Sequence, residues 1–129
     1  MISGIDHVSL PMQDTAAMVA FYLALGFEVV ELPAVVSVYC GRQMINFHCP
    51  ETWQRHGFTL RAPAAAPPCG DLCFVWEGSQ ESLCTLLDRV GAAIEEGPVT
   101  RHGGRWIDGT SVYVRDPDGN LLEFMIYAG

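Results

Sequence analysis

Three polar side chains stand in otherwise apolar stretches and are candidates for metal ligands. Glu123 lies in the middle of the apolar run Leu121–Tyr127, where a carboxylate must meet a cation, hydrogen-bond donors or water because its charge is costly to bury. Binding of a metal ion is the most specific of these explanations. His7, near the N-terminus, and His48, at the end of an apolar segment, could supply further ligands.

Ordinary structural roles remain open for each of these residues. A histidine in a strand is commonly satisfied by its neighbours, and Glu123 alone could face solvent on an edge strand. The metal interpretation therefore depends on whether the chain brings the three residues to related places.

A turn and a strand must position Glu123. Asp116-Pro117-Asp118-Gly119 has the composition of a type I turn, and the apolar run after it is typical of a strand. The first half of the chain predicts a βαβββ pattern, followed by a linker rich in Pro, Ala and Gly. The expected elements are a strand at Gly4–Leu10, a helix between Asp14 and Gly26, and strands at Phe27–Leu32, Val35–Cys40 and Met44–Cys49.

The second half of the chain repeats the first. The helix terminators Gly26 and Gly91 are 65 residues apart, whereas Tyr39 and Tyr113 are 74 apart, so a nine-residue insertion enters the second copy as the loop Thr100–Asp108. Such repetition indicates two similar structural units. The sequence therefore predicts an α+β fold of two tandem βαβββ modules in one domain. The predicted divisions are module 4–49, linker 50–70 and module 71–127 within the domain 1–129.

The repeat also predicts which positions are equivalent. His48 and Glu123 fall at nearly the same distance from the repeated tyrosines, so they are expected at matching places on the last strand of each module. His7 corresponds to Leu72, which cannot bind a metal. Cys73 is expected to face the opposite side of its strand.

Several segments together resemble the vicinal oxygen chelate superfamily, which includes glyoxalases, extradiol dioxygenases and bleomycin resistance proteins. They are IDHVSL, LGF, INFH and RDPDGNLLE, and they cover the chain from Ile5 to Tyr127. The combination of INFH, EGPV and RDPDGN is similar to the branch resembling glyoxalase domain-containing protein 5. The resemblance implies paired modules that form a curled mixed sheet around a central cup holding a divalent metal.

By this resemblance the metal ligands are His7, His48 and Glu123, and Glu123 is also the candidate catalytic base. Glyoxalases with four protein ligands place the fourth at the position of Leu72, so two histidines and one carboxylate remain. That set is able to hold Fe, Mn, Ni, Co or Zn. Arg101, in the inserted loop, is the candidate for binding an anionic part of the substrate. The other interpretation of this loop is an ordinary solvated one.

Three functions follow from the resemblance. The first is a metal-dependent glyoxalase-like lyase or isomerase that acts on a small substrate with vicinal oxygens, where the metal stabilises a developing oxyanion. The second is an Fe(II) extradiol-type dioxygenase, which two histidines and one carboxylate suit. The third is a metal-free drug-binding resistance protein, which the acidic composition allows because such drugs are often cationic.

Composition limits the partners of the protein. A net charge of -8 and a pI near 4.7 disfavour nucleic acid and anionic membrane surfaces. No apolar run approaches the length of a membrane span, and the first residues lack a signal-peptide pattern. Five cysteines without a Cys-x-x-Cys pair are typical of reduced thiols, so a cytoplasmic location is expected. The resemblance implies a homodimer that binds a small-molecule substrate.

Overall fold

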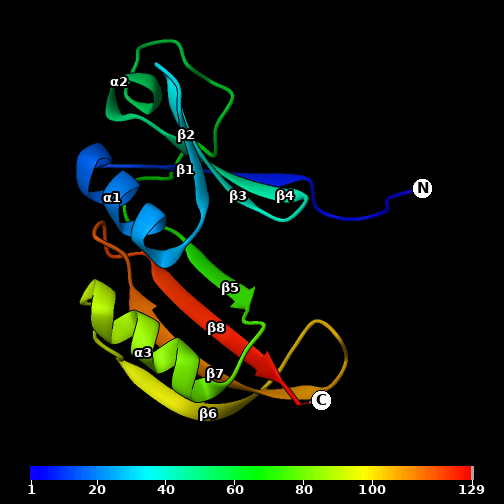
Figure 1. Ribbon diagram of the computed structural model, residues 1–129. Coiled ribbons are helices and arrows are strands. Elements are labelled where there is room, and N and C mark those ends of the chain that lie inside the picture. The colour runs from blue at the N-terminus through cyan, green and yellow to red at the C-terminus, as the bar shows by residue number, and fades with distance from the viewer. Residues whose placement is uncertain (129) are drawn as a thin grey trace. The chain divides into compact units, whose positions relative to one another are not determined.

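The computed structural model describes residues 1–128, and the chain forms two compact units, Met1–Gly70 and Asp71–Gly129. Each unit contains one four-stranded mixed sheet and one helix of 11 residues, in the order strand, helix and three strands (Figure 1). The predicted α+β class with two tandem βαβββ modules is therefore confirmed. Both sheets are open rather than closed into barrels.

The sheet of the first unit has the strand order β1-β4-β3-β2, with β1 parallel to β4 and the other pairs antiparallel. Its elements are β1 His7–Pro11, α1 Thr15–Leu25, β2 Glu28–Glu31, β3 Val35–Cys40, β4 Gln43–His48 and the short α2 Pro50–Trp53. Tyr22 of α1 and Phe47 of β4 are both 0% exposed, and their ring centroids are 5.4 Å apart. These two rings join the helix to one face of the sheet.

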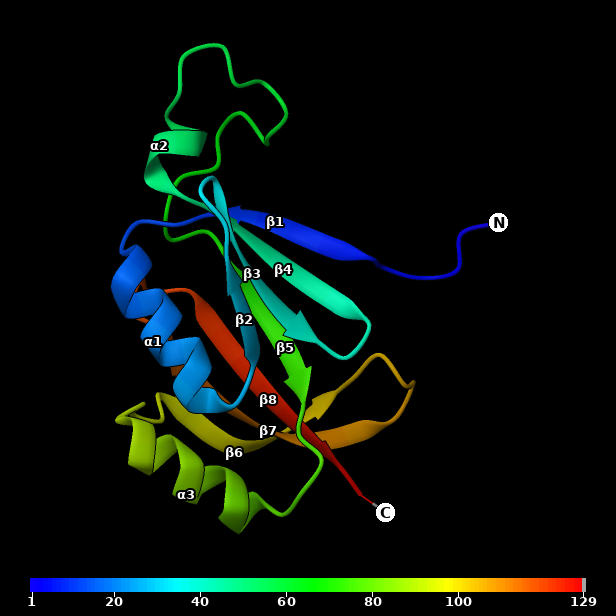
Figure 2. The same cartoon turned by 45° about the horizontal axis from the view of Figure 1, so that its top comes forward.

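The sheet of the second unit has the order β5-β8-β7-β6, with β5 parallel to β8. Its elements are β5 Asp71–Val75, α3 Gln80–Val90, β6 Glu96–His102, β7 Asp108–Arg115 and β8 Leu121–Tyr127. Figures 1 and 2 show α3 lying along this sheet. Leu83 and Leu87 of the helix are fully buried, as are Val112 and Leu122 of the strands. The core of this unit therefore lies on the helix side of its sheet.

The first long helix begins and ends at the predicted residues, and the second ends at the predicted Gly91. The side chains of Asp14 and Ser79 cap the two N-termini by accepting hydrogen bonds from backbone N–H groups of the first turn. Gly26 and Gly91 end the helices in the left-handed conformation, which glycine adopts without steric cost. The helices of the described residues are not long and apolar enough to cross a membrane.

The nine-residue insertion is a longer hairpin rather than the predicted loop. β6 continues to His102 and β7 starts at Asp108, and these two residues are paired with each other. Backbone pairing takes up four of the nine inserted residues, and each added pair satisfies N–H and C=O groups that a loop would leave to solvent. Only residues 103–107 remain as the hairpin tip.

A buried carboxylate organises the turn that leads into β8. Asp116 is 5% exposed, and its Oδ1 accepts hydrogen bonds from the backbone N–H groups of Asp118, Gly119 and Asn120 at 2.9–3.1 Å. Its Oδ2 accepts a fourth from the Asn120 side chain at 2.8 Å. The predicted turn is confirmed, and it fixes the start of the strand that carries Glu123.

We expect Asp116→Ala to lower the free energy of unfolding by about 2–4 kcal/mol, because four donors lose a charged acceptor within a buried turn. Chemical denaturation followed by circular dichroism measures the change. Asp88→Ala, at an exposed position of α3, is the matched control and should change stability by less than about 0.5 kcal/mol. Equal effects of the two substitutions would contradict this role for Asp116.

Candidate functional site

Glu123 lies on the central strand β8 of the second unit, between β5 and β7. Its register partners are Cys73 of β5 and Tyr113 of β7. Residues paired in a sheet point to the same face, so these three side chains lie side by side. Leu122 and Phe124, the chain neighbours of Glu123, are buried on the opposite face. Alternation thus places the half-buried Glu123 on the polar face of the sheet.

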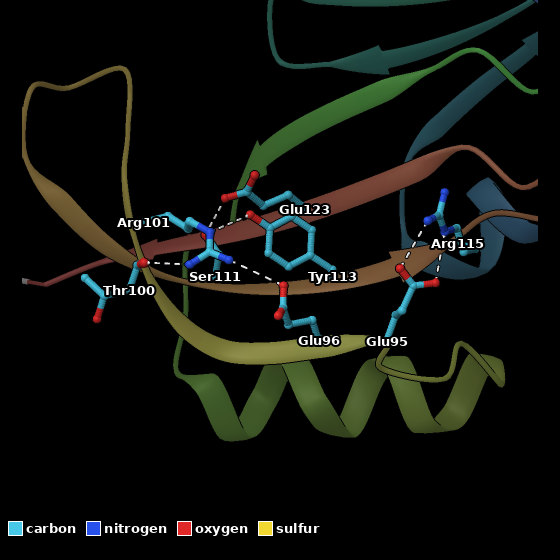
Figure 3. Close-up of polar contacts among 8 residues, drawn as sticks. All are labelled: Glu95, Glu96, Thr100, Arg101, Ser111, Tyr113, Arg115 and Glu123. Carbon is cyan, nitrogen blue, oxygen red and sulfur yellow. Dashed lines mark hydrogen bonds and ion pairs between the residues drawn. The ribbon is translucent and has the colours of Figure 1, made fainter.

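A serine hydroxyl orients the Glu123 carboxylate. Ser111, which is fully buried, donates from Oγ to Glu123 Oε2 at 2.5 Å (Figure 3). Tyr113 stands next to this pair. Burial raises the pKa of its hydroxyl, the hydrogen bond from Arg101 opposes that rise, and the nearby Glu123 carboxylate adds to it. The carboxylate therefore meets hydroxyl groups that the sheet itself positions.

Arg101 lies beside Tyr113 and is bound to protein groups. Its Nε donates to the Tyr113 hydroxyl at 3.1 Å and its Nη1 to the Thr100 carbonyl at 3.0 Å, and Nη2 lies 3.4 Å from Glu96 Oε2. The guanidinium also lies 5.6 Å from the centroid of the Tyr113 ring. These contacts hold the Tyr113 side chain in place. The predicted contact of Arg101 with substrate stays a prediction.

Cys73 faces Glu123 rather than the opposite side of its strand. The expected orientation was wrong because β5 pairs Cys73, and not Leu72, with Glu123. Burial, then the Glu123 carboxylate, raises the pKa of the Cys73 thiol to about 12. A thiolate next to a carboxylate would place two negative charges together, so the sulfur stays protonated at neutral pH.

A pocket of about 290 Å³ opens beside Glu123. Its lining includes Cys73 and Tyr127 of the sheet, together with residues 102–105 at the hairpin tip. Gly103 is fitted against this wall, because a Cβ at that position would overlap the Tyr127 hydroxyl at 1.9 Å and Met125 Sδ at 2.5 Å. The absence of a side chain at Gly103 therefore allows the tip to lie directly on the sheet.

The structure does not bring His7 and His48 together. In the parallel pairing of β1 and β4, His7 is opposite Met44, and Pro11 is opposite His48. The two histidines share a face of the sheet but are four positions apart along the strands, a separation of about 13 Å. Side chains that stand perpendicular to a sheet do not bridge such a distance to one metal ion.

His48 has surroundings of a different kind. Its ring lies edge-on to Phe58, with centroids 5.5 Å apart. Burial, and after it the positive charge of Arg61, lowers the pKa of His48 and favours the neutral imidazole. Arg61 itself is held over the Trp53 ring at 5.6 Å from the centroid. A cation beside His48 opposes the binding of a second cation there.

The registers also replace the predicted equivalence of His48 and Glu123. Tyr39 is opposite Met44 in the first unit, and Tyr113 is opposite Glu123 in the second. The counterpart of Glu123 is therefore Met44, and His48 lies four positions further along its strand. Counting along one strand missed this, because a sheet position is defined by its cross-strand partner.

His7 and Glu123 have the surroundings expected of metal ligands. His7 Nδ1 is 2.7 Å from Asp6 Oδ1, and a carboxylate on one ring nitrogen commonly fixes the other for a metal. Glu123 is likewise oriented by a hydrogen bond, from Ser111. These donor atoms suit a divalent ion. Among residues 1–128, however, no three His, Cys, Asp or Glu side chains are gathered as a metal-binding group.

The sequence analysis missed Ser111, Tyr113, Cys73 and Arg105 as residues around Glu123. A signal for the first two was present, because Ser111 and Tyr113 alternate with buried valines in a strand joined to β8 by a short turn. The register of β5 against β8 links segments about fifty residues apart, and nothing in the local pattern specifies it.

We expect Glu123→Gln to increase the rate at which iodoacetamide alkylates Cys73 at pH 8.5 by about tenfold or more. Removing the negative charge lowers the thiol pKa, and each unit raises the thiolate fraction tenfold. Peptide mass spectrometry over time gives the rate for Cys73 alone. Glu81→Gln, at an exposed position of α3, is the control. Unchanged Cys73 reactivity in Glu123→Gln would contradict the contact.

Comparison with known proteins identifies relatives over almost the whole chain. The virulence protein STM3117 of Salmonella typhimurium is 34% identical over 129 residues, covering 98% of this chain and 86% of that protein. The glyoxalase domain-containing protein RDO1 of Mycosarcoma maydis is 33% identical, covering 98% of this chain and 69% of that protein. These sequence identities, over nearly the whole chain, indicate a shared family and not only a shared fold.

A solved structure agrees with this relationship. The lactoylglutathione lyase of Agrobacterium tumefaciens has a TM-score of 0.72 and 28% sequence identity, and the match covers 97% of this chain and 94% of that one. A family model matches residues 4–124. The chain therefore belongs to the Glyoxalase/Bleomycin resistance protein/Dioxygenase superfamily.

Proposed function

We propose that this protein is a metal-dependent glyoxalase-like lyase or isomerase that acts on a small substrate with vicinal oxygens. The observation that carries the proposal is the Glu123 carboxylate, which Ser111 orients at the wall of a pocket of about 290 Å³. The family and the similarity to a lactoylglutathione lyase support this class of reaction. The homodimer and the cytoplasmic location stay predictions.

Glu123 is the acid–base group of the proposed reaction. Its Oε2 accepts the Ser111 hydrogen bond, and a carboxylate held through one oxygen keeps lone pairs on the other for a substrate proton. Abstraction of a proton from a carbon beside a carbonyl and its return to the neighbouring carbon converts one vicinal-oxygen isomer into the other. Tyr113, held by Arg101, fixes the position of Glu123 from the side.

Glu123 would hold a divalent metal in this proposal, and His7 stays a predicted ligand. The metal, when bound, supplies a Lewis acid that polarises the vicinal oxygens and stabilises negative charge on them. Asp6 orients the His7 ring through Nδ1, and Ser111 orients the carboxylate. His48 is assigned no part in the same centre, because β1 and β4 place it four positions from His7.

Loss of the carboxylate should abolish turnover. We expect Glu123→Gln to lower kcat by about 100-fold or more for the hemithioacetal of methylglyoxal and glutathione, because the glutamine amide cannot accept the proton. Glu81→Gln should retain full activity. Oxygen consumption with a catechol, monitored in parallel, would instead indicate the dioxygenase reaction. Full lyase activity in Glu123→Gln would refute the assignment of Glu123.

Metal content should depend on His7 and Glu123 and not on His48. We expect His7→Ala and Glu123→Gln to reduce the metal bound per chain by about tenfold or more, because each removes a predicted ligand. His48→Ala should leave it unchanged. Mass spectrometry on untagged protein purified without chelators measures the metal. A loss in His48→Ala equal to that in His7→Ala would overturn this ligand assignment.

A further inference from the structure

We propose that Arg105 binds an anionic group of the substrate. The substrate of the proposed reaction is then a small compound with vicinal oxygens at one end and a carboxylate or phosphate at the other. This inference rests on the proposed function, because Glu123 marks the reacting end. The part of the same pocket formed by the tip of the β6–β7 hairpin would then recognise the anionic group of the substrate.

Arg105 and Glu123 line one pocket and carry opposite charges. The Arg105 guanidinium lies over the Tyr127 ring, with Cζ 4.6 Å from the ring centroid. Stacking of this kind fixes the orientation of the planar guanidinium group. Its charged neighbour in the described chain is Glu77, at 3.9 Å from Nη2, and that carboxylate is 89% exposed. Such a solvated pair is weak, so the guanidinium is available to an anion.

The hairpin tip holds Arg105 at the pocket through a tight and unusual turn. Gly103 N donates to the Ile107 carbonyl at 3.0 Å, and Trp106 N donates to the Gly103 carbonyl at 3.2 Å. Trp106 has a φ of 67° and is the one non-glycine residue with positive φ among residues 1–128. Tryptophan in this conformation carries a free-energy cost that a merely solvated loop has no reason to keep. The turn points to a function for the side chain that it presents next to Trp106.

Arg105 suits this role better than the neighbouring Arg101. The Arg101 guanidinium is bound to the Tyr113 hydroxyl, to a backbone carbonyl and to Glu96, and it does not line the pocket. Arg105 lines the pocket, and within residues 1–128 its contacts are the stacking on Tyr127 and the weak pair with Glu77. An incoming carboxylate or phosphate can therefore form paired hydrogen bonds with Arg105 without displacing a protein partner.

The charge distribution of the chain strengthens the inference. The protein has a net charge of -8 and only 7 basic side chains, so most of its surface repels anions. Arg105 nevertheless lines this small pocket. A guanidinium in a pocket that also holds one carboxylate matches a substrate that is itself anionic at one end. The volume of about 290 Å³ restricts that substrate to a small molecule.

Calorimetric titration of the full chain, as purified, tests the inference with matched probes. Dihydroxyacetone phosphate is compared with dihydroxyacetone, and glycerate with glycerol, because each pair shares its neighbouring oxygens and differs in the anion. We expect an anionic probe to bind at least about tenfold more tightly than its neutral partner, as a charge-assisted contact provides. The more tightly bound anion identifies phosphate or carboxylate as the recognised group.

Variants assign the selectivity to one side chain. Arg105→Gln should abolish the preference for the anionic probe, and Arg105→Lys should restore part of it, because the charge remains without the planar fork. Arg89→Gln, at an exposed position of α3, removes the same charge elsewhere and should leave the preference intact. Thermal unfolding of each variant establishes that the comparison is made on folded protein.

Equal affinity for anionic and neutral probes, no binding of either anion, or a preference that survives Arg105→Gln would each overturn the inference. The outcome is distinguishable from failure of the proposed function, because binding is measured without turnover. Suppose that the protein has no lyase activity but that Arg105→Gln loses the preference for anions. This result would support the anion-binding site and would refute only the proposed reaction.

Discussion

The hydrogen bond between Ser111 and Glu123 is the interaction on which the polar face of the second unit depends. It connects β7 to β8 across the sheet, and at 2.5 Å it fixes one oxygen of a carboxylate that the strand would otherwise leave to solvent. Tyr113 and Cys73 flank this carboxylate through strand pairing. Their positions follow from backbone hydrogen bonds, so the site is as rigid as the sheet that carries it.

Local sequence signals predicted the architecture well because they act over a few residues. Asp14 and Gly26 cap a helix through contacts with the adjacent turn, and Asp116 organises its turn through the next four residues. The 65-residue offset then showed that the second unit repeats the first. Each of these features depends on chemistry that is visible within a short stretch of chain.

The pairing of residues across neighbouring strands could not be predicted from such local signals. Whether Cys73 or Leu72 faces Glu123 depends on a one-residue choice of register between β5 and β8, and such a shift moves every side chain to the other face. The separation of His7 from His48 has the same origin. The two arginines of the inserted segment also look alike in sequence. Contacts with Tyr113 and Tyr127, made after the hairpin forms, distinguish Arg101 from Arg105.

The high pKa of Cys73 has a consequence for the chemical durability of the pocket wall. Dicarbonyls and related electrophiles modify thiolates, and a pocket sulfur that ionised readily would be consumed by the molecules it meets. Burial, and after it the Glu123 carboxylate, keeps the Cys73 thiol protonated. A carboxylate beside a thiol thereby protects the pocket wall, because a protonated sulfur reacts slowly with whatever electrophile enters.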